Sequence, residues 1–330
     1  MVRIAELLMG TALLAGCAGH GGATGRTAAG LSAGNSVPAF NSDSAYSYIA
    51  RQVEFGPRVP NTEPHRSCAR WLESRLVSSG ARTYVQEIEV TAFDGTRIKG
   101  FNIIGKYNPQ VKKRIMLCSH WDSRPWADND PDAGNRKKPF DAANDGASGV
   151  GVILEIARQL QQKLPEIGVD LAFFDAEDWG PGNDWNGADR TEMWGLGTQY
   201  WARHLKEEEK NIRFAVLLDM VGGRDASFCR ESFSDHFAPA VVDKVWNAAR
   251  VAGYGRFFPD RTSGFVTDDH LFINSIAGIP AIDIIPFYPE CAESSFGPTW
   301  HTVNDNLENI EKSTLQAVGQ TLLQVIYSER

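Results

Sequence analysis

The sequence lacks the patterns that mark several large classes of protein. Its 330 residues carry a net charge of −8, and the longest basic runs are those at 112–114 and 136–138, which argues against nucleic-acid binding. No central apolar run is long enough to span a membrane, and no internal repeat is visible. The charged fraction of 22% and the apolar fraction of 42% are ordinary for a soluble globular protein.

Cysteine is scarce, and one of the five residues stands apart near the N-terminus. Residues 1–17 contain a short apolar stretch followed by small residues, which is typical of a secretory signal. Leu14-Ala15-Gly16-Cys17 resembles the bacterial lipoprotein box, in which the cysteine becomes the lipidated N-terminus; an ordinary cleaved signal is the alternative. We therefore predict an exported cell-envelope lipoprotein that faces the periplasm and meets the membrane only through a lipid anchor. The choice between inner and outer membrane stays open.

The other four cysteines identify neither a redox site nor a metal site. An exported protein can form disulfides, and four cysteines allow three full pairings. Free thiols buried in the core fit the pattern equally well. We take none of them as a metal ligand. The four are Cys68, Cys118, Cys229 and Cys291.

A tether and a single catalytic domain are expected after the leader. Residues 18–39 are rich in Gly, Ala, Ser and Thr, the composition of a flexible linker. Residues 40–330 alternate helix and strand patterns, which predicts a three-layer α/β domain: a mostly parallel mixed sheet with helices on both faces. An antiparallel hairpin is expected at one end of the sheet. Strands are predicted at 84–90, 100–106, 114–119, 169–174, 214–219 and 281–285, and helices at 43–54, 64–79, 148–163, 191–206, 235–252 and 311–328.

Acidic residues and a histidine follow several of the predicted strands. The apolar run at 169–174 leads to Glu177 and Asp178, and two further strands lead to His120 and Asp219. A solvated loop acid is the simpler interpretation of any one of these residues. The recurrence at several strand ends favours a site, because functional residues of α/β sheets lie at the carboxyl ends of the strands.

The candidate site combines carboxylates and imidazoles without a thiolate. Such ligands suit a catalytic zinc, which takes three protein ligands and keeps one position open for water or substrate. The spacing alone is moderate support, because no two ligands form a tight motif such as His-Glu-x-x-His. The candidate residues are His120, Asp145, Glu177, Asp178, Asp219 and His301.

Six short motifs, in this order, resemble a known family. They are Ser-His-Trp-Asp-Ser at 119–123, Asn-Asp-Gly-Ala-Ser at 144–148, Phe-Phe-Asp-Ala-Glu-Asp at 173–178, Leu-Leu-Asp-Met at 217–220, Asp-Asp-His at 268–270 and Trp-His-Thr at 300–302. The chain resembles the zinc-dependent glutaminyl-peptide cyclotransferases (glutaminyl cyclases) of the zinc-aminopeptidase fold, especially their bacterial members. Each motif is weak alone, but in this order and spacing they are strong, and the resemblance covers roughly residues 40–330.

The resemblance implies roles for the central residues. Asp145, Asp178 and His301 would bind one zinc ion per chain, and Glu177 would be the general acid/base. The implied reaction converts the N-terminal glutamine of peptides and proteins to pyroglutamate and releases ammonia. We expect a monomer, and the physiological substrates cannot be read from the sequence.

The resemblance also implies a surrounding shell. Asp219 and Asp268 would form a hydrogen-bond network around the general acid/base, and Trp300 would line the substrate pocket. Among the tryptophans after the acid pair we favour Trp185 as a second pocket residue. Asp283 stands where animal members carry a histidine, and its role stays open.

A two-zinc aminopeptidase that removes N-terminal residues is the alternative. His120 and Asp219 match positions that carry the second zinc in those hydrolases, although the role of His120 here stays open. Gly146 argues against this alternative, because the aminopeptidases carry a further acid at that position. A lipoprotein that has lost catalysis is a third possibility, and the intact Glu177 argues against it.

Overall fold

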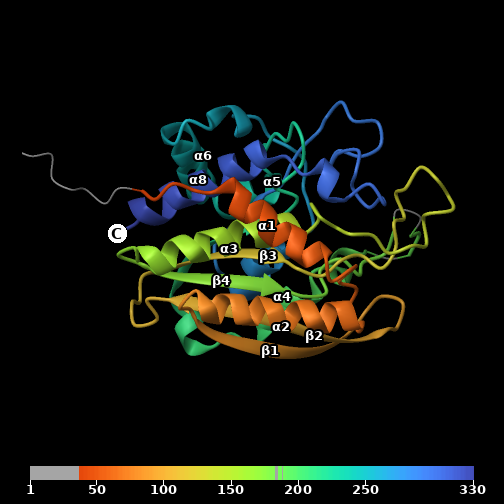
Figure 1. Ribbon diagram of the computed structural model, residues 1–330, viewed down its shortest axis with the longest axis horizontal. Helices are drawn as coiled ribbons and strands as arrows, with labels where there is room; N and C mark the ends of the chain where they lie inside the picture. Colours follow the sequence, from red (N-terminus) through yellow and green to blue (C-terminus); the bar gives the residue numbers. More distant parts are fainter. Residues whose placement is uncertain (1–36, 183–184, 188) are drawn as a thin grey trace, which may run out of the picture. The chain divides into compact units, whose positions relative to one another are not determined.

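The computed structural model describes residues 37–330 apart from 183, 184 and 188. The predicted leader and almost all of the predicted tether, including Cys17, fall outside the described residues. The described chain forms a six-stranded mixed sheet with helices on both faces (Figure 1), which confirms the predicted three-layer α/β class. Within this part of the chain, the helices are too short or too polar to cross a membrane.

The sheet has the strand order β1-β2-β4-β3-β5-β6. The predicted hairpin is present, because β1 pairs antiparallel with β2 at one edge. Strand β2 also pairs antiparallel with β4, whereas β4, β3, β5 and β6 run parallel to one another. The strands are β1 Arg82–Thr91, β2 Arg97–Tyr107, β3 Arg114–His120, β4 Gly168–Phe174, β5 Ile212–Leu218 and β6 Ala281–Ile284.

Four helices lie within a residue of their predicted bounds, and two predicted helices are interrupted. The prediction of one helix at 191–206 was wrong, because Gly195 adopts a left-handed conformation (φ 57°) and starts a shorter helix. The predicted helix at 235–252 is split at Ala238, which has a non-helical backbone (φ −140°, ψ 47°) before Pro239. The helices are α1 Ser42–Val53, α2 Glu63–Ser78, α3 Ala147–Gln162, α4 Leu196–Arg203, α5 Ser232–Phe237, α6 Pro239–Val251, α7 Asp269–Phe272 and α8 Lys312–Ser328.

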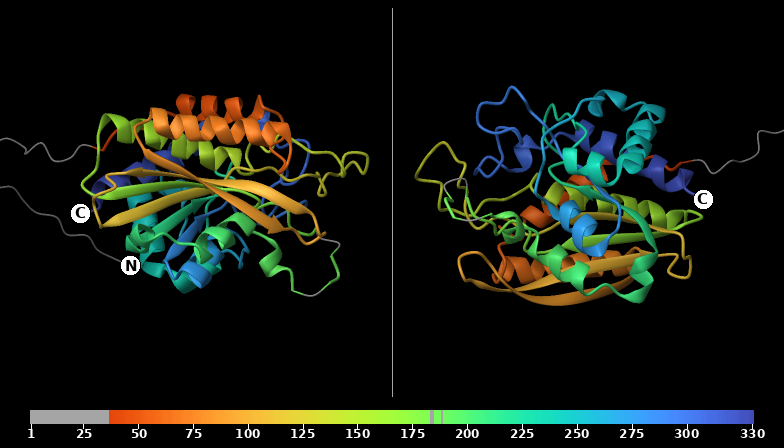
Figure 2. Two further views of the ribbon diagram at one scale, coloured as in Figure 1. Left: turned by 90° about the horizontal axis from the view of Figure 1, so that it is seen from below. Right: turned by 180° about the vertical axis from the view of Figure 1, so that it is seen from behind.

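The two faces of the sheet are buried in two separate apolar cores. Along β3, Ile115 and Leu117 pack into the larger core, and Met116 and Cys118 pack into the smaller one, as the alternation of side chains along a strand requires. Helices α1, α2, α3, α6 and α8 cover the first face, and α4 and α7 cover the second (Figure 2). The four described cysteines are free thiols, and only Cys291 is not fully buried.

The first turn of α3 packs directly against the carboxyl ends of β3 and β5. Gly149 lies in this turn, where a Cβ atom would overlap the carbonyl oxygen of Leu218 and the hydroxyl of Ser119. That hydroxyl donates to the carbonyl of Gly146 at 3.2 Å. The close approach holds the residues that precede α3, including Asp145, at the strand ends.

We predict that Gly149→Ala destabilises the protein, because the added methyl group has no room between helix and strands. Overpacking typically costs about 1–3 kcal/mol, which exceeds the gain of up to about 1 kcal/mol from replacing a helical glycine. The midpoint of chemical denaturation measures this change. Gly264→Ala is the matched control, because the described residues leave open space around its Cβ position. Equal midpoints for the two variants would contradict the close packing.

Candidate metal centre and active site

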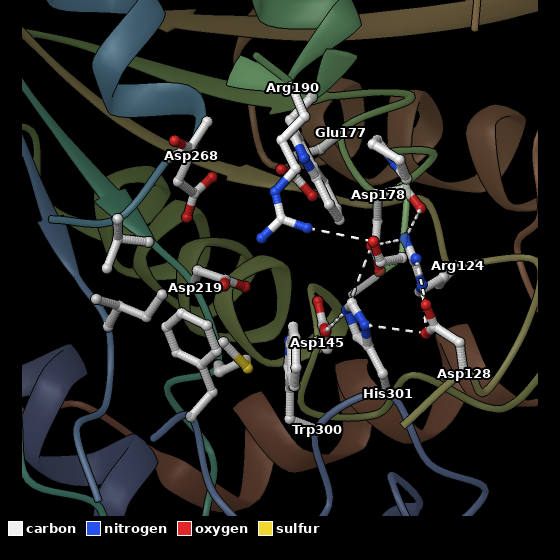
Figure 3. Close-up of a pocket in the computed structure, with 18 of the residues that line it drawn as sticks. Arg124, Asp128, Asp145, Glu177, Asp178, Arg190, Asp219, Asp268, Trp300 and His301 are labelled. Atoms are coloured by element: carbon white, nitrogen blue, oxygen red, sulfur yellow. Dashed lines mark hydrogen bonds and ion pairs between the residues drawn. The ribbon is translucent and has the colours of Figure 1, made fainter. Parts of the chain in front are cut away.

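The candidate site lies at the carboxyl edge of the parallel strands. His120 ends β3, Asp219 directly follows β5, and Glu177 follows β4 by three residues. Asp145 precedes α3, and His301 comes from the long loop between β6 and α8. The structure therefore brings together the side chains whose convergence the sequence predicted, and Figure 3 shows most of them around one pocket.

Two buried carboxylates anchor the backbone of the acids at this edge. Asp122 accepts hydrogen bonds from the amides of Glu177 at 3.1 Å and Asp178 at 3.2 Å. Asp305 accepts from the amide of Asp145 at 3.0 Å and from that of the residue before it at 2.7 Å. The chain reaches the acid pair through a left-handed residue, Ala176 (φ 53°). Strained residues of this kind persist where the surroundings enforce them, as these hydrogen bonds do.

Asp145, Asp178 and His301 offer three ligand atoms that all lie within 4.8 Å of one another. His301 Nε2 lies 3.5 Å from Asp145 Oδ2 and 3.4 Å from Asp178 Oδ1. All three side chains are buried. Burial opposes a charged imidazole, but the carboxylates of Asp178 and then Asp128 raise the pKa of His301 to about 9. The electrostatic potential at this cluster is therefore strongly negative, which favours the binding of a cation.

The donor set fits zinc. Asp178 Oδ2 is buried and has no hydrogen-bond partner among the described residues, so one carboxylate oxygen remains available to a ligand. Two carboxylates and one imidazole match the three protein ligands of a catalytic zinc site. The chemistry of these residues points to zinc, and their individual roles as ligands stay predictions.

Two residues that the sequence analysis missed orient this cluster. Asp128 Oδ1 lies 3.3 Å from His301 Nδ1, the ring nitrogen that faces away from the two acids. Arg124 is fully buried and donates to Asp178 Oδ1 at 3.1 Å and to Asp128 Oδ2 at 2.7 Å. Such partners fix the orientation of metal ligands. Burial raises the pKa of Asp128, but hydrogen bonds from His301 and Arg124 outweigh burial and lower it.

A second cluster shares Asp145 with the first. His120 Nε2 lies 3.0 Å from Asp145 Oδ1 and 3.2 Å from Asp219 Oδ1. The ring packs on Gly146, where a Cβ atom would lie 2.6 Å from Nε2 and would overlap the His120 carbonyl oxygen. This position of His120 therefore requires glycine at 146. All ligand types for a second metal are present, as the sequence analysis noted.

Glu177 lines the pocket beside these clusters and is not part of either. Its side chain is 7% exposed. Burial, and then the negative charge of Asp268, raise the pKa of Glu177 well above the ordinary glutamate value. Asp268 and Asp219 also line the pocket, and their predicted hydrogen-bond network around Glu177 stays a prediction. A buried acid with a raised pKa is a candidate for proton transfer near neutral pH.

The pocket has a volume of about 290 Å³ and aromatic walls. Trp300 stacks on His301, with ring centroids 3.9 Å apart. The structure places Trp194, rather than the predicted Trp185, in this pocket. Trp185 lines an adjacent hollow beside Phe93. The sequence could not separate the two tryptophans, because the path of the loop after β4 decides which one faces the acids.

Comparisons with known proteins match this geometry. The model of peptidase family M28 matches residues 102–326. The crystal structure of Bacteroides thetaiotaomicron glutaminyl cyclase bound to N-acetylhistamine is 52% identical and covers 89% of this chain and 100% of its own, with a TM-score of 0.86. A Zn-dependent exopeptidase from Parabacteroides distasonis is 49% identical over 89% of this chain and 100% of its own, also with a TM-score of 0.86.

A curated relative extends the similarity to animals. The glutaminyl-peptide cyclotransferase of Boiga irregularis is 27% identical over 302 residues, which span 82% of this chain and 77% of that protein. The family match covers more than half of the chain and includes all of its candidate site residues. The chain belongs to peptidase family M28.

Proposed function

We propose that this protein is a glutaminyl-peptide cyclotransferase, which converts the N-terminal glutamine of peptides and proteins to pyroglutamate and releases ammonia. The observation that carries the proposal is the similarity to a glutaminyl cyclase at 52% identity over 89% of this chain. The position of Glu177, a pocket acid outside the candidate metal cluster, supports it. Membership of the family alone does not identify the reaction, because the family also includes exopeptidases.

The reaction sets the demands on the pocket. The α-amine of the substrate attacks the carbon of its own side-chain amide, so the amine loses a proton and the departing nitrogen gains one. The chemistry that a zinc ion at Asp145, Asp178 and His301 supplies when bound is polarisation of the amide carbonyl. The reference pKa of an α-amine is near 8, so a fair fraction of it is already neutral at physiological pH. Positioning therefore matters more than a strong base.

Glu177 is the proposed proton carrier. Its carboxylate accepts the proton of the attacking amine and then donates it to the departing ammonia, so that one residue serves as base and acid. Its raised pKa brings the carboxyl closer to the pH at which both steps occur. Asp219 and Asp268 are proposed to hold this carboxyl in place, and Trp300 and Trp194 to enclose the aliphatic part of the glutamine side chain.

One zinc ion per chain is the proposed metal content. His120 and Asp219 hydrogen-bond to each other, and His120 also contacts Asp145. Gly146 makes room for the histidine at this place. An acidic side chain at position 146 would displace His120. These contacts support a structural use of His120 and a single zinc ion, against the two-zinc aminopeptidase alternative.

The predicted lipid anchor remains part of the proposal, although it lies outside the described residues. Substrate peptides would then meet the enzyme in the periplasm, and the protein would act as a monomer tethered to the membrane. The N-terminal motif Leu14-Ala15-Gly16-Cys17 supports the anchor.

We predict that the purified protein removes ammonia from a Gln-initiated peptide. Mass spectrometry measures the loss, and the same peptide with an acetylated N-terminus is the control, because a blocked amine cannot attack. A Leu-initiated peptide should stay intact. Steady release of free leucine without cyclisation of the Gln peptide would assign the protein to the aminopeptidases instead.

We predict that Glu177→Gln keeps its zinc and loses most of its turnover, because the proton carrier is removed while Asp178 remains. Loss of a general acid/base typically costs about 10²- to 10⁴-fold in rate. Turnover is measured with the Gln peptide and zinc by elemental analysis. Asp178→Asn is the contrasting variant and should lose zinc as well. A Glu177→Gln enzyme with normal turnover would exclude the assigned role.

We predict that Cys17→Ser abolishes both fatty-acid labelling and membrane association. Cells are grown with a clickable fatty acid, fractionated, and tested for the label on this protein. Cys291→Ser is the control, because it removes a cysteine from the catalytic domain instead. Wild-type protein without label in the periplasmic fraction would indicate an ordinary cleaved signal.

A further inference from the structure

Asp283 is a fully buried acid that the proposed mechanism does not use. It lies within β6, paired with Leu217 of the neighbouring strand β5. Its neighbours Ile282 and Ile284 pack into the larger core, so the side chain of Asp283 points to the opposite face of the sheet, toward α7. There Asp283, Asp268 and His270 offer three polar atoms within 4.8 Å of one another.

The histidine of this group is oriented by a different acid. His270 Nε2 lies 2.9 Å from Glu231 Oε2, whereas Nδ1 lies 3.9 Å from Asp283 Oδ2, beyond hydrogen-bonding distance. Burial raises the pKa of Glu231, but His270 and the backbone donors outweigh burial and lower it. Glu231 is thus a carboxylate with several hydrogen-bond donors. Its further donors are the amides of Phe233, Ser234 and Val266 and the hydroxyl of Ser234.

Asp283 has the opposite surroundings. Within the described residues, no N–H group and no hydroxyl donates a hydrogen bond to either of its oxygens. An ionised carboxylate without a donor is costly to bury, so such a site favours the protonated form. Burial, the charges of Asp268, Asp219 and Glu231, and a hydrogen bond to Asp268 raise the pKa of Asp283 well above its ordinary value. The other titratable groups that face it are His270 and Cys118.

We propose that Asp283 is kept as a neutral carboxylic acid whose O–H donates a hydrogen bond to Asp268, so that the two carboxyl groups hold one proton between them. Two adjacent buried carboxyls cannot both ionise without a large penalty. Asp268 lines the catalytic pocket and Asp283 does not. Asp283 is therefore a positioning residue, which fixes the carboxylate of Asp268 beside Glu177. This last step rests on the proposed function, and the shared proton does not.

The test compares Asp283→Asn with Asp283→Ala in the zinc-loaded enzyme. Asparagine has the same size, and its amide N–H can donate to Asp268 as the O–H does, so kcat/KM for a Gln peptide should stay within about threefold of wild type. Alanine removes this donor and leaves Asp268 with the amide of Asp269, and loss of positioning can cost about 10²-fold. An Asn variant as inactive as the Ala variant would overturn the positioning role.

Stability against pH tests the shared proton without any substrate. The acid has a raised pKa in the folded state and an ordinary pKa near 4 in the unfolded state, so unfolding releases its proton above about pH 4. This proton therefore makes the wild-type protein less stable as pH rises from about 4. Asp283→Asn has no such proton, so its stability lacks this pH dependence. The melting temperature of the Asn variant, relative to wild type, should increase from pH 5 to pH 8.

Glu231→Gln is the matched control in the same cluster. The carboxylate of Glu231 accepts hydrogen bonds from five donors. Replacing this carboxylate with an amide should therefore lower the melting temperature of the protein at neutral pH. If Asp283→Asn is also destabilised throughout this pH range, Asp283 is ionised and the proposal fails. It also fails if wild type holds a metal ion that Asp283→Asn loses. An enzyme without cyclase activity but with the expected pH dependence would refute the proposed function and keep the shared proton.

Discussion

The burial of many carboxyl groups at one edge of the sheet is the constraint on which the rest of the site depends. Asp145, Asp178, Asp219, Asp268 and Glu177 are each at most 7% exposed. Carboxylates at such density in a low dielectric repel one another, so they require cations, hydrogen-bond donors or protons. Arg124 pairs with Asp178, and backbone amides satisfy Asp122 and Asp305. A zinc ion and retained protons are the proposed solutions for the others.

The same constraint explains how neighbouring acids acquire different roles. Burial raises the pKa of Asp178, but His301 and then Arg124 outweigh burial and lower it, so Asp178 stays an anion that can bind a metal. For Glu177, the preceding residue, burial and then the negative charge of Asp268 outweigh the charge of His120 and raise the pKa. The turn at Ala176 and the amide bonds to Asp122 hold the two side chains in these different surroundings. Backbone geometry thus places an adjacent pair of acids in surroundings that suit the proposed metal ligand and the proposed proton carrier.

The sequence predicted the elements that have strong periodicity and could not predict those set by loops. The strand ends and the acids that follow them were predictable, because parallel strands bring their carboxyl ends to one edge. Arg124 and Asp128 were missed because they lie in a loop without periodic pattern, and only their contacts with Asp178 and His301 reveal them. The prediction of one helix at 191–206 and the choice of Trp185 as a pocket residue failed for the same reason. The backbone conformation after β4 decides where the helix begins and places Trp194 in the pocket.

The position and number of the bound metal test the central claim most directly. Crystals of the wild-type protein grown with zinc should be measured at the zinc absorption edge, where anomalous scattering locates the ion. The account predicts one peak per chain, between Asp145, Asp178 and His301. A second peak of similar strength between His120, Asp145 and Asp219 would contradict the single-zinc cyclase site and favour a two-metal hydrolase.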